Sequence, residues 1–140
     1  MEPETRMPMV ILVEDSPADT YIIRESLKRY VKDFELRVLE DGEKAIRFVD
    51  ALESDEELPC PSIWLLDLNL PRRSGHEVLQ RIKRSRCAHV PVVVVTSSDS
   101  PADRAATTKM GATAYFCKPV DLDAFLTVGE LVQRLIGSQD

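Results

Sequence analysis

The sequence predicts a doubly wound α/β domain, in which helices cover both faces of a parallel sheet. Short runs of β-branched and other apolar residues alternate along the chain with longer segments of helical period. Most of these runs are apolar almost without interruption, which is typical of strands buried on both faces. Right-handed crossovers between parallel strands place helices on both sides of such a sheet. We therefore expect five strands and five helices in one domain over residues 1–140, with a core at about 8–136 and no output domain.

Five apolar runs are the predicted strands. They are residues 9–13, 35–39, 62–66, 90–95 and 114–117. Helix-start patterns lie between them. Ser16-Pro17 and Ser100-Pro101 each offer an N-cap followed by a proline at the first helical position, and Ser74 with Glu77 has the spacing of a capping box.

Two segments are assigned from their composition and period. A last helix is expected after Asp121, because apolar residues from 122 to 135 fall on one stripe. Gly111 is expected at C′, just past the end of the helix that begins at Ser100-Pro101. The run "ALESDEELPCPS", residues 51–62, is expected to end the second helix and continue as an extended surface loop.

The composition is acidic, with 24 Asp and Glu against 18 Lys and Arg and a formal net charge of −6. This balance argues against binding to nucleic acid phosphates. No apolar run approaches the roughly 20 residues that span a bilayer, and the N-terminus lacks a basic start followed by an apolar signal core. We expect a cytoplasmic protein with no membrane or nucleic acid partner.

Three cysteines and two histidines are expected to lie outside any site. Cys60, Cys87 and Cys117 are far apart and form no C-x-x-C pair, so all three are predicted to be reduced thiols. His76 and His89 lie in different segments without a metal-spaced partner and are predicted at the surface.

Polar residues follow four of the five predicted strands, at the edge of the sheet where ligands bind in this fold class. They are Glu14, Asp15, Asp67, Asn69, Thr96, Ser97, Ser98 and Lys118, the last of which is followed by Pro119. Taken singly, the acids could cap helices or turns and the lysine could be solvated. Their joint placement at one edge favours a functional site. Asp19, in the first turn of a helix, is attributed to the helix dipole and left out of this site.

The three carboxylates at this edge predict a metal site. If the first and third strands are neighbours, Glu14, Asp15 and Asp67 converge, and like charges that close need a cation. Carboxylate and carbonyl oxygens are the ligands of a hard ion, which favours Mg²⁺, with Mn²⁺ as a substitute. Asp67 is then placed to attack a phosphoryl group, whose oxygens the Lys118 ammonium and the Thr96 hydroxyl would contact.

The pattern Glu14-Asp15, Asp67-x-Asn69-x-Pro71, Gly75, Thr96 and Lys118-Pro119 resembles the receiver domain of two-component response regulators. The resemblance covers essentially the whole chain. It implies the flavodoxin-like receiver fold with strand order 2-1-3-4-5. It also implies transfer of a phosphoryl group from a kinase histidine to Asp67, in a protein that is a phospho-acceptor and not an enzyme.

The resemblance also assigns roles to the site residues. Asp15 would bind Mg²⁺ directly, Glu14 mainly through water, and Asn69 through its backbone carbonyl. Thr96, Ser97 and Lys118 would hold the phosphoryl group, although the family usually has Ala or Gly where Ser97 stands. Thr96 and Tyr115 would form the switch that reshapes the surface of the fourth helix, fifth strand and fifth helix. The Lys118-Pro119 bond would be cis, as is usual in relatives.

A finer resemblance links the chain to single-domain regulators that serve bacterial phytochrome histidine kinases. It rests on the stretch "VEDSPADTYIIRESL" (residues 13–27) and on the acidic loop before the third strand. It implies a phytochrome-type sensor kinase as phosphodonor, an unknown downstream protein, and a homodimer through the face between the fourth and fifth helices.

The sequence leaves three other functions to consider beside the receiver. A metal-dependent phosphohydrolase that passes through an aspartyl phosphate remains the alternative, although Asn69 stands where such enzymes place a second Asp. A flavodoxin-like cofactor site is disfavoured because Glu14-Asp15 would repel a phosphate. An EF-hand starting at Asp67 fails because Arg72 and Val78 stand where Gly and Glu are needed.

Overall fold

The protein forms a five-stranded parallel sheet, described here for residues 7–137 in a computed structural model. The strand order is β2-β1-β3-β4-β5, and every neighbouring pair is parallel. The strands are β1 (Met9–Val13), β2 (Glu35–Leu39), β3 (Ile63–Leu66), β4 (Val92–Thr96) and β5 (Ala114–Cys117). The predicted strands and the predicted order are both confirmed.

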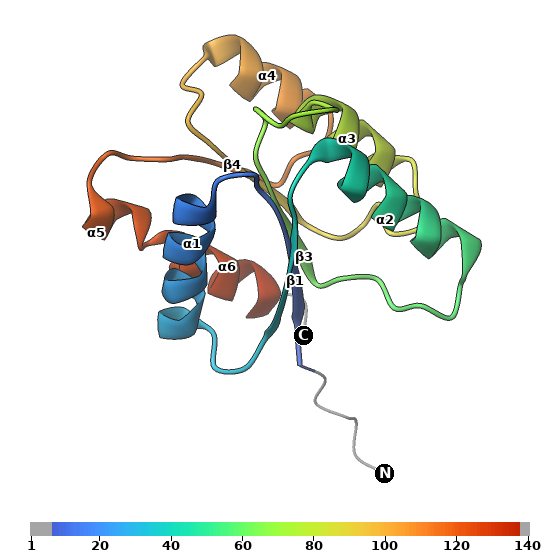
Figure 1. The fold of residues 1–140 in the computed structure, drawn as a ribbon, viewed down its shortest axis with the longest axis horizontal. Coiled ribbons are helices and arrows are strands. Elements are labelled where there is room, and N and C mark those ends of the chain that lie inside the picture. Colours follow the sequence, from blue (N-terminus) through green and yellow to red (C-terminus); the bar gives the residue numbers. More distant parts are fainter. Residues whose placement is uncertain (1–6, 138–140) are drawn as a thin grey trace.

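Helices cover both faces of the sheet. They are α1 (Pro17–Tyr30), α2 (Gly42–Ser54), α3 (Gly75–Lys83), α4 (Pro101–Lys109), α5 (Leu122–Phe125) and α6 (Val128–Gly137). Figure 1 shows α1 and α6 on one side of the sheet and α2 and α3 on the other. The doubly wound α/β fold is therefore confirmed. Among residues 7–137, no helix combines the length and the apolar character that crossing a bilayer requires.

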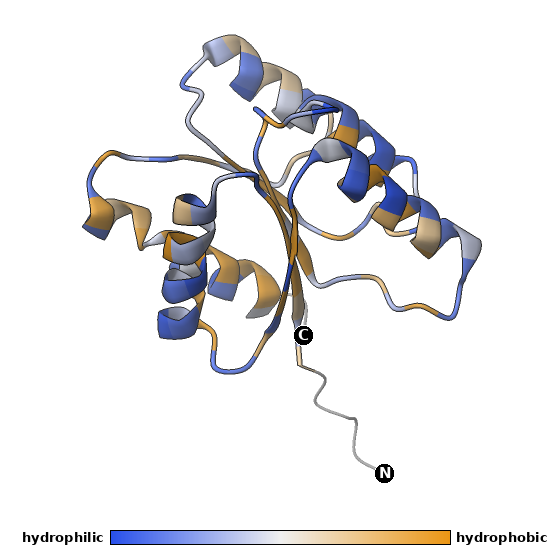
Figure 2. Ribbon diagram, viewed as in Figure 1, coloured by the Kyte–Doolittle hydropathy of each residue, from blue (hydrophilic) through white to orange (hydrophobic). Residues whose placement is uncertain are grey.

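The strand side chains divide into two buried clusters, one on each face. In β1, Ile11 and Val13 pack with α2 and α3, while Val10 and Leu12 pack with α1 and α6. Figure 2 shows the hydrophobic residues running along the strands. The central strands are buried on both sides, because consecutive strand side chains point to opposite faces.

The predicted helix ends are present. Ser16 and Ser100 accept hydrogen bonds from the backbone amides of Asp19 and Asp103, and the capping box of Ser74 and Glu77 is complete. Gly111 has a φ of 103°, the left-handed backbone that ends α4 and favours glycine. These local interactions fix where α1, α3 and α4 begin, directly after the loops that carry the polar residues.

The last predicted helix is interrupted, so α5 and α6 are two parts of it. The Ser26 hydroxyl of α1 donates to the Leu126 carbonyl at 2.6 Å, and the Gly129 amide donates to the Ser26 hydroxyl at 2.7 Å. Gly129 lies so close to α1 that a Cβ atom would sit 2.5 Å from the Ser26 carbonyl oxygen. The interruption therefore arises from packing against α1, which the apolar stripe does not reveal.

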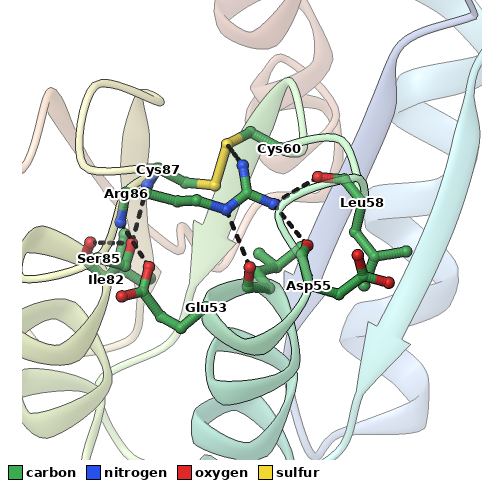
Figure 3. The surroundings of a disulfide bond; sticks show 9 residues. Glu53, Asp55, Leu58, Cys60, Ile82, Ser85, Arg86 and Cys87 are labelled. Carbon is green, nitrogen blue, oxygen red and sulfur yellow. Dashed lines mark hydrogen bonds between the residues drawn. A yellow bond between two sulfur atoms is a disulfide. The ribbon is translucent and has the colours of Figure 1, made fainter.

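The prediction that all three cysteines are reduced was wrong for two of them. Cys60 and Cys87 form a disulfide that joins the loop after α2 to the segment after α3, whereas Cys117 is free. Figure 3 shows the Arg86 guanidinium beside this bond, donating to the carbonyls of Asp55 and Leu58 and to Cys60 Sγ. The packing of α2 against α3 brings the two cysteines to a Cα separation of 5.7 Å.

Candidate functional site

The carboxyl ends of β1 and β3 bring three acidic side chains together. These strands are neighbours, and Val13 pairs with Leu66 at the ends of both. Glu14, Asp15 and Asp67 follow directly, and each offers a carboxylate oxygen within 4.8 Å of the others. Glu14 and Asp67 are buried, whereas Asp15 is exposed to solvent. The predicted acidic cluster is therefore present, with one side open.

Lys118 follows β5 and reaches across the sheet edge into this cluster. Its Nζ lies 2.7 Å from Glu14 Oε1, 2.8 Å from Asp19 Oδ2 and 3.0 Å from Asp67 Oδ2. Only 7% of the Lys118 side chain is exposed. One buried ammonium is thus shared by three carboxylates, so the site keeps an excess of negative charge.

The environment of Glu14 and Lys118 shifts both pKa values. Burial raises the pKa of the Glu14 carboxyl from 4.5 to about 7, although the hydrogen bond and charge of Lys118 act in the opposite direction. For Lys118, burial lowers the pKa, but the hydrogen bonds to Asp19 and Glu14 outweigh it and raise the pKa above its usual value. Lys118 is therefore a permanent cation at neutral pH.

Asp19 lies in the site, which corrects its attribution to the helix dipole alone. It stands in the first turn of α1, and its carboxylate accepts a hydrogen bond from Lys118. The sequence does hold an indication, because Asp19 follows Asp15 by four residues, the spacing that places side chains on one helix face. That spacing is informative only when both residues lie in the helix, and Asp15 precedes α1.

The loop after β3 shapes the surroundings of Asp67. The backbone amide of Asn69 donates to Asp67 Oδ1 at 3.1 Å, and the Asn69 residue is exposed. Gly75 packs so closely that a Cβ atom would lie 2.3 Å from the Asp67 carbonyl oxygen, so only glycine fits. Arg72 has a φ of 75°, a left-handed conformation in the same loop. This tight turn holds the Asp67 carboxylate towards Lys118.

β4 ends at Thr96, which is fully buried, and the loop that follows begins with Ser97, which is exposed. The Ser98 amide donates to the Thr96 hydroxyl oxygen at 3.4 Å. Tyr115 of β5 is half-buried, and its hydroxyl donates to the Ser98 carbonyl at 2.9 Å. The Arg104 guanidinium lies over the Tyr115 ring, 4.4 Å from its centroid. The two predicted switch residues, Thr96 and Tyr115, therefore meet at Ser98.

The Lys118-Pro119 bond is not cis in the structure. Every peptide bond within residues 7–137 is trans, so the expectation of a cis bond before Pro119, which rested on the resemblance alone, was wrong. The general preference of X-Pro bonds for trans is about 0.5–1 kcal/mol. Lys118 reaches the acidic cluster with this trans bond.

The donor set fits a hard divalent cation. Glu14, Asp15 and Asp67 offer carboxylate oxygens, which such ions prefer over the nitrogen and sulfur ligands of zinc sites. The single ammonium of Lys118 leaves negative charge for a cation to balance. The cluster is thus an acidic metal site at the open end of the sheet.

Comparison with known proteins identifies the class. Residues 10–129 match the family described as the response regulator receiver domain. The chain belongs to this family, and as a receiver domain it is a phospho-acceptor and not a catalytic enzyme. The phosphohydrolase alternative is thereby set aside.

Individual relatives show which kind of receiver domain the chain resembles. The chain is 40% identical over 124 residues to the response regulator Rcp1 of Synechocystis sp., a match that covers 87% of this chain and 84% of Rcp1. The Mn²⁺-bound structure of Rcp1 superposes with a TM-score of 0.78, 36% identity and 91% coverage of both chains. The structure of the phosphorylated cyanobacterial phytochrome response regulator RcpA gives a TM-score of 0.85, with 27% identity over 96% of this chain and 97% of RcpA. The chain is thus similar to phytochrome-associated regulators.

Proposed function

We propose that Asp67 accepts a phosphoryl group from the phosphohistidine of a sensor kinase, and that the resulting aspartyl phosphate changes which proteins this domain binds. The proposal treats residues 1–140 as one receiver unit that acts in the cytoplasm. It is supported by Rcp1 and RcpA, whose solved chains this sequence covers almost completely.

The observation that carries the proposal is the contact of Lys118 with Asp67. The ammonium lies 3.0 Å from Asp67 Oδ2 and is held there by Glu14 and Asp19. A buried cation beside a carboxylate is placed to stabilise the charge that develops on a phosphoryl group transferred to that carboxylate.

The transfer step is a displacement at phosphorus. An oxygen of the Asp67 carboxylate attacks, a phosphorus–oxygen bond forms, and the phosphorus–nitrogen bond to the kinase imidazole breaks. Lys118 neutralises one phosphoryl oxygen, and the Thr96 hydroxyl donates to another. Ser97, exposed at the edge of the site, offers a further donor.

We propose Mg²⁺, with Mn²⁺ as a substitute, as the ion of the acidic cluster. Glu14, Asp15 and Asp67 would hold it, with the Asn69 carbonyl as a further ligand. When bound, the ion supplies positive charge to the phosphoryl oxygens. The Mn²⁺-bound structure of Rcp1 supports this assignment.

Tyr115 would transmit the effect of phosphorylation to the surface that binds other proteins. Contact between Thr96 and the phosphoryl group would alter the loop after β4, where the Tyr115 hydroxyl is bound to the Ser98 carbonyl. A change in this contact shifts an equilibrium of the α4, β5 and α5 surface. Val120 and Leu122, on that surface, are exposed hydrophobic residues.

The donor we propose is a histidine kinase of the bacterial phytochrome type. The support is the similarity to RcpA, named as a phytochrome response regulator, and to the bacteriophytochrome response regulator RtBRR, with 32% identity and a TM-score of 0.73 over 91% of this chain and 78% of RtBRR. We further propose a homodimer through the α4 to α5 face. Sedimentation at tens of micromolar protein should show a dimer, and a monomer with and without beryllofluoride would contradict it.

Intact mass spectrometry tests the phospho-acceptor. The protein is incubated with acetyl phosphate and Mg²⁺, beside a metal-free control and the Asp67→Asn variant. We expect one phosphoryl adduct that requires both Mg²⁺ and Asp67. An adduct that forms equally on Asp67→Asn would overturn the assignment.

A further inference from the structure

A chain of contacts links α3 to the switch through α4. His76 of α3 places Nε2 3.2 Å from Asp103 Oδ1 of α4. Asp103 Oδ2 accepts a hydrogen bond from the Ser98 hydroxyl. The Ser98 amide reaches Thr96, and the Ser98 carbonyl accepts from Tyr115. Ser98 is thus bound through its side chain, its amide and its carbonyl, and His76 stands at the far end of the chain.

His76 and Asp103 are each held by contacts at the start of their own helix. His76 follows Gly75, whose amide donates to the Leu68 carbonyl in the loop after Asp67. Asp103 is fixed by its own helix start, because its amide donates to the Ser100 hydroxyl at 3.2 Å. The contact of His76 with Asp103 therefore ties the loop after β3 to the loop after β4. The first loop carries Asp67, and the second follows Thr96, the last residue of β4.

We propose that His76 and Asp103 are positioning residues for the Thr96 hydroxyl. This inference rests on the proposed function, in which Thr96 donates to the phosphoryl group. The hydroxyl oxygen of Thr96 accepts from the Ser98 amide, which leaves the Thr96 proton free to donate in another direction. Holding Ser98 in place therefore holds Thr96 in a donating orientation.

The contacts between these groups lie near the surface and not in the buried core. The side chains of His76 and Asp103 are 35% and 30% exposed, so each can exchange its partner for water. Ser98 also takes part in the contact with Tyr115, whose ring lies under Arg104 of α4. The link therefore couples α3, α4 and β5 at one residue, so its loss should be felt at Tyr115 as well as at Thr96.

Beryllofluoride binding in excess Mg²⁺ is the test, because this probe occupies the phosphoryl position without a chemical step. We expect the His76→Ala and Asp103→Ala variants to bind beryllofluoride about three- to tenfold more weakly than wild type, the range for the loss of a partly exposed polar contact. His76→Gln, which keeps a donor, should recover part of the loss. Mg²⁺ affinity should change by less than about twofold, because none of these side chains is a proposed ligand.

Matched controls separate positioning from general destabilisation. His89 is an exposed histidine elsewhere, and Glu130 is an exposed acid in the first turn of α6. His89→Ala and Glu130→Ala should bind beryllofluoride as wild type does. A double variant with Tyr115→Phe gives a second readout, since coupled residues show non-additive losses. We expect His76→Ala to weaken binding less in the Tyr115→Phe background than in wild type.

The outcomes distinguish this inference from the proposed function. Wild type that binds beryllofluoride, with His76→Ala and Asp103→Ala no weaker than the controls, overturns the positioning role and leaves the phospho-acceptor intact. The positioning role is also overturned if the double variant loses as much beryllofluoride affinity as the product of the two single losses, from His76→Ala and from Tyr115→Phe. Wild type that fails to bind beryllofluoride overturns both.

Discussion

The Lys118 ammonium lies 3.0 Å from Asp67 Oδ2, although the two residues stand 51 positions apart in the chain. β5 and β3 deliver them to the same edge of the sheet, with β4 between. Glu14 and Asp19 surround the same ammonium. This contact makes Lys118 the electrostatic centre of the site.

The Lys118→Met variant tests this role. Methionine keeps much of the side-chain volume but leaves Glu14, Asp19 and Asp67 without their common cation. We expect the unfolding free energy of the metal-free protein to fall by about 2–4 kcal/mol, because the acids lose a buried partner. Urea unfolding followed by the fluorescence of Trp64 measures it. Lys44→Met, which removes an exposed ion pair with Glu40, should cost far less, because exposed ion pairs contribute little to stability. Equal losses in both variants would contradict the account.

The stability of the metal-free protein should depend on the ionisation of Glu14. Because its pKa is raised from 4.5 to about 7 in the folded state, the folded protein binds more protons than the unfolded chain in that window. The contribution of the protonated Glu14 carboxyl to stability is therefore fully present below about pH 4.5 and is lost as the pH rises through about 7. Glu14→Gln should flatten this fall in urea unfolding measured across the window. A fall of equal slope in both proteins would show that Glu14 is not its source.

The disulfide between Cys60 and Cys87 should contribute strongly to stability. It closes a loop between residues 27 apart, for which chain entropy predicts about 3–4 kcal/mol. We expect reduction, or the Cys60→Ser and Cys87→Ala double variant, to lower the unfolding free energy by that amount. Titration of the denatured, unreduced chain should give one thiol, from Cys117. Three thiols would contradict the bond, and Cys117→Ser serves as the control for loss of a single cysteine.

Ser26 should be a key contact between α1 and the interrupted last helix. Its hydroxyl is buried and serves both Leu126 and Gly129. Ser26→Ala leaves a carbonyl and an amide unpaired in the interior, so we expect a loss of about 1–3 kcal/mol in thermal or urea unfolding. Ser54→Ala, which removes one exposed hydrogen bond to Asp50, is the matched control. A loss no larger than that of the control would contradict the role.

The sequence was sufficient for the sheet and for most of the acidic cluster, for a physical reason. Glu14, Asp67 and Lys118 each follow an apolar strand, and parallel strands bring their carboxyl ends to one edge. Helix starts at Ser16, Ser74 and Ser100 could be predicted because capping is a local interaction.

The features that sequence reasoning missed depend on contacts between distant segments. Cys60 and Cys87 meet only because α2 packs on α3, and their spacing carries no sign of this. The break between α5 and α6 depends on the close approach of Gly129 to Ser26. The pairing of His76 with Asp103 requires the first turns of α3 and α4 to lie close together, which the apolar pattern of either helix leaves open.

The most direct test of the central claim is to locate the phosphoryl group chemically. After incubation with acetyl phosphate and Mg²⁺, borohydride reduces an aspartyl phosphate to homoserine, which peptide mass spectrometry assigns to one position. The account predicts homoserine at residue 67 alone, and none in a metal-free sample. Homoserine at another carboxylate, such as residue 15 or 19, with residue 67 unchanged, would contradict it.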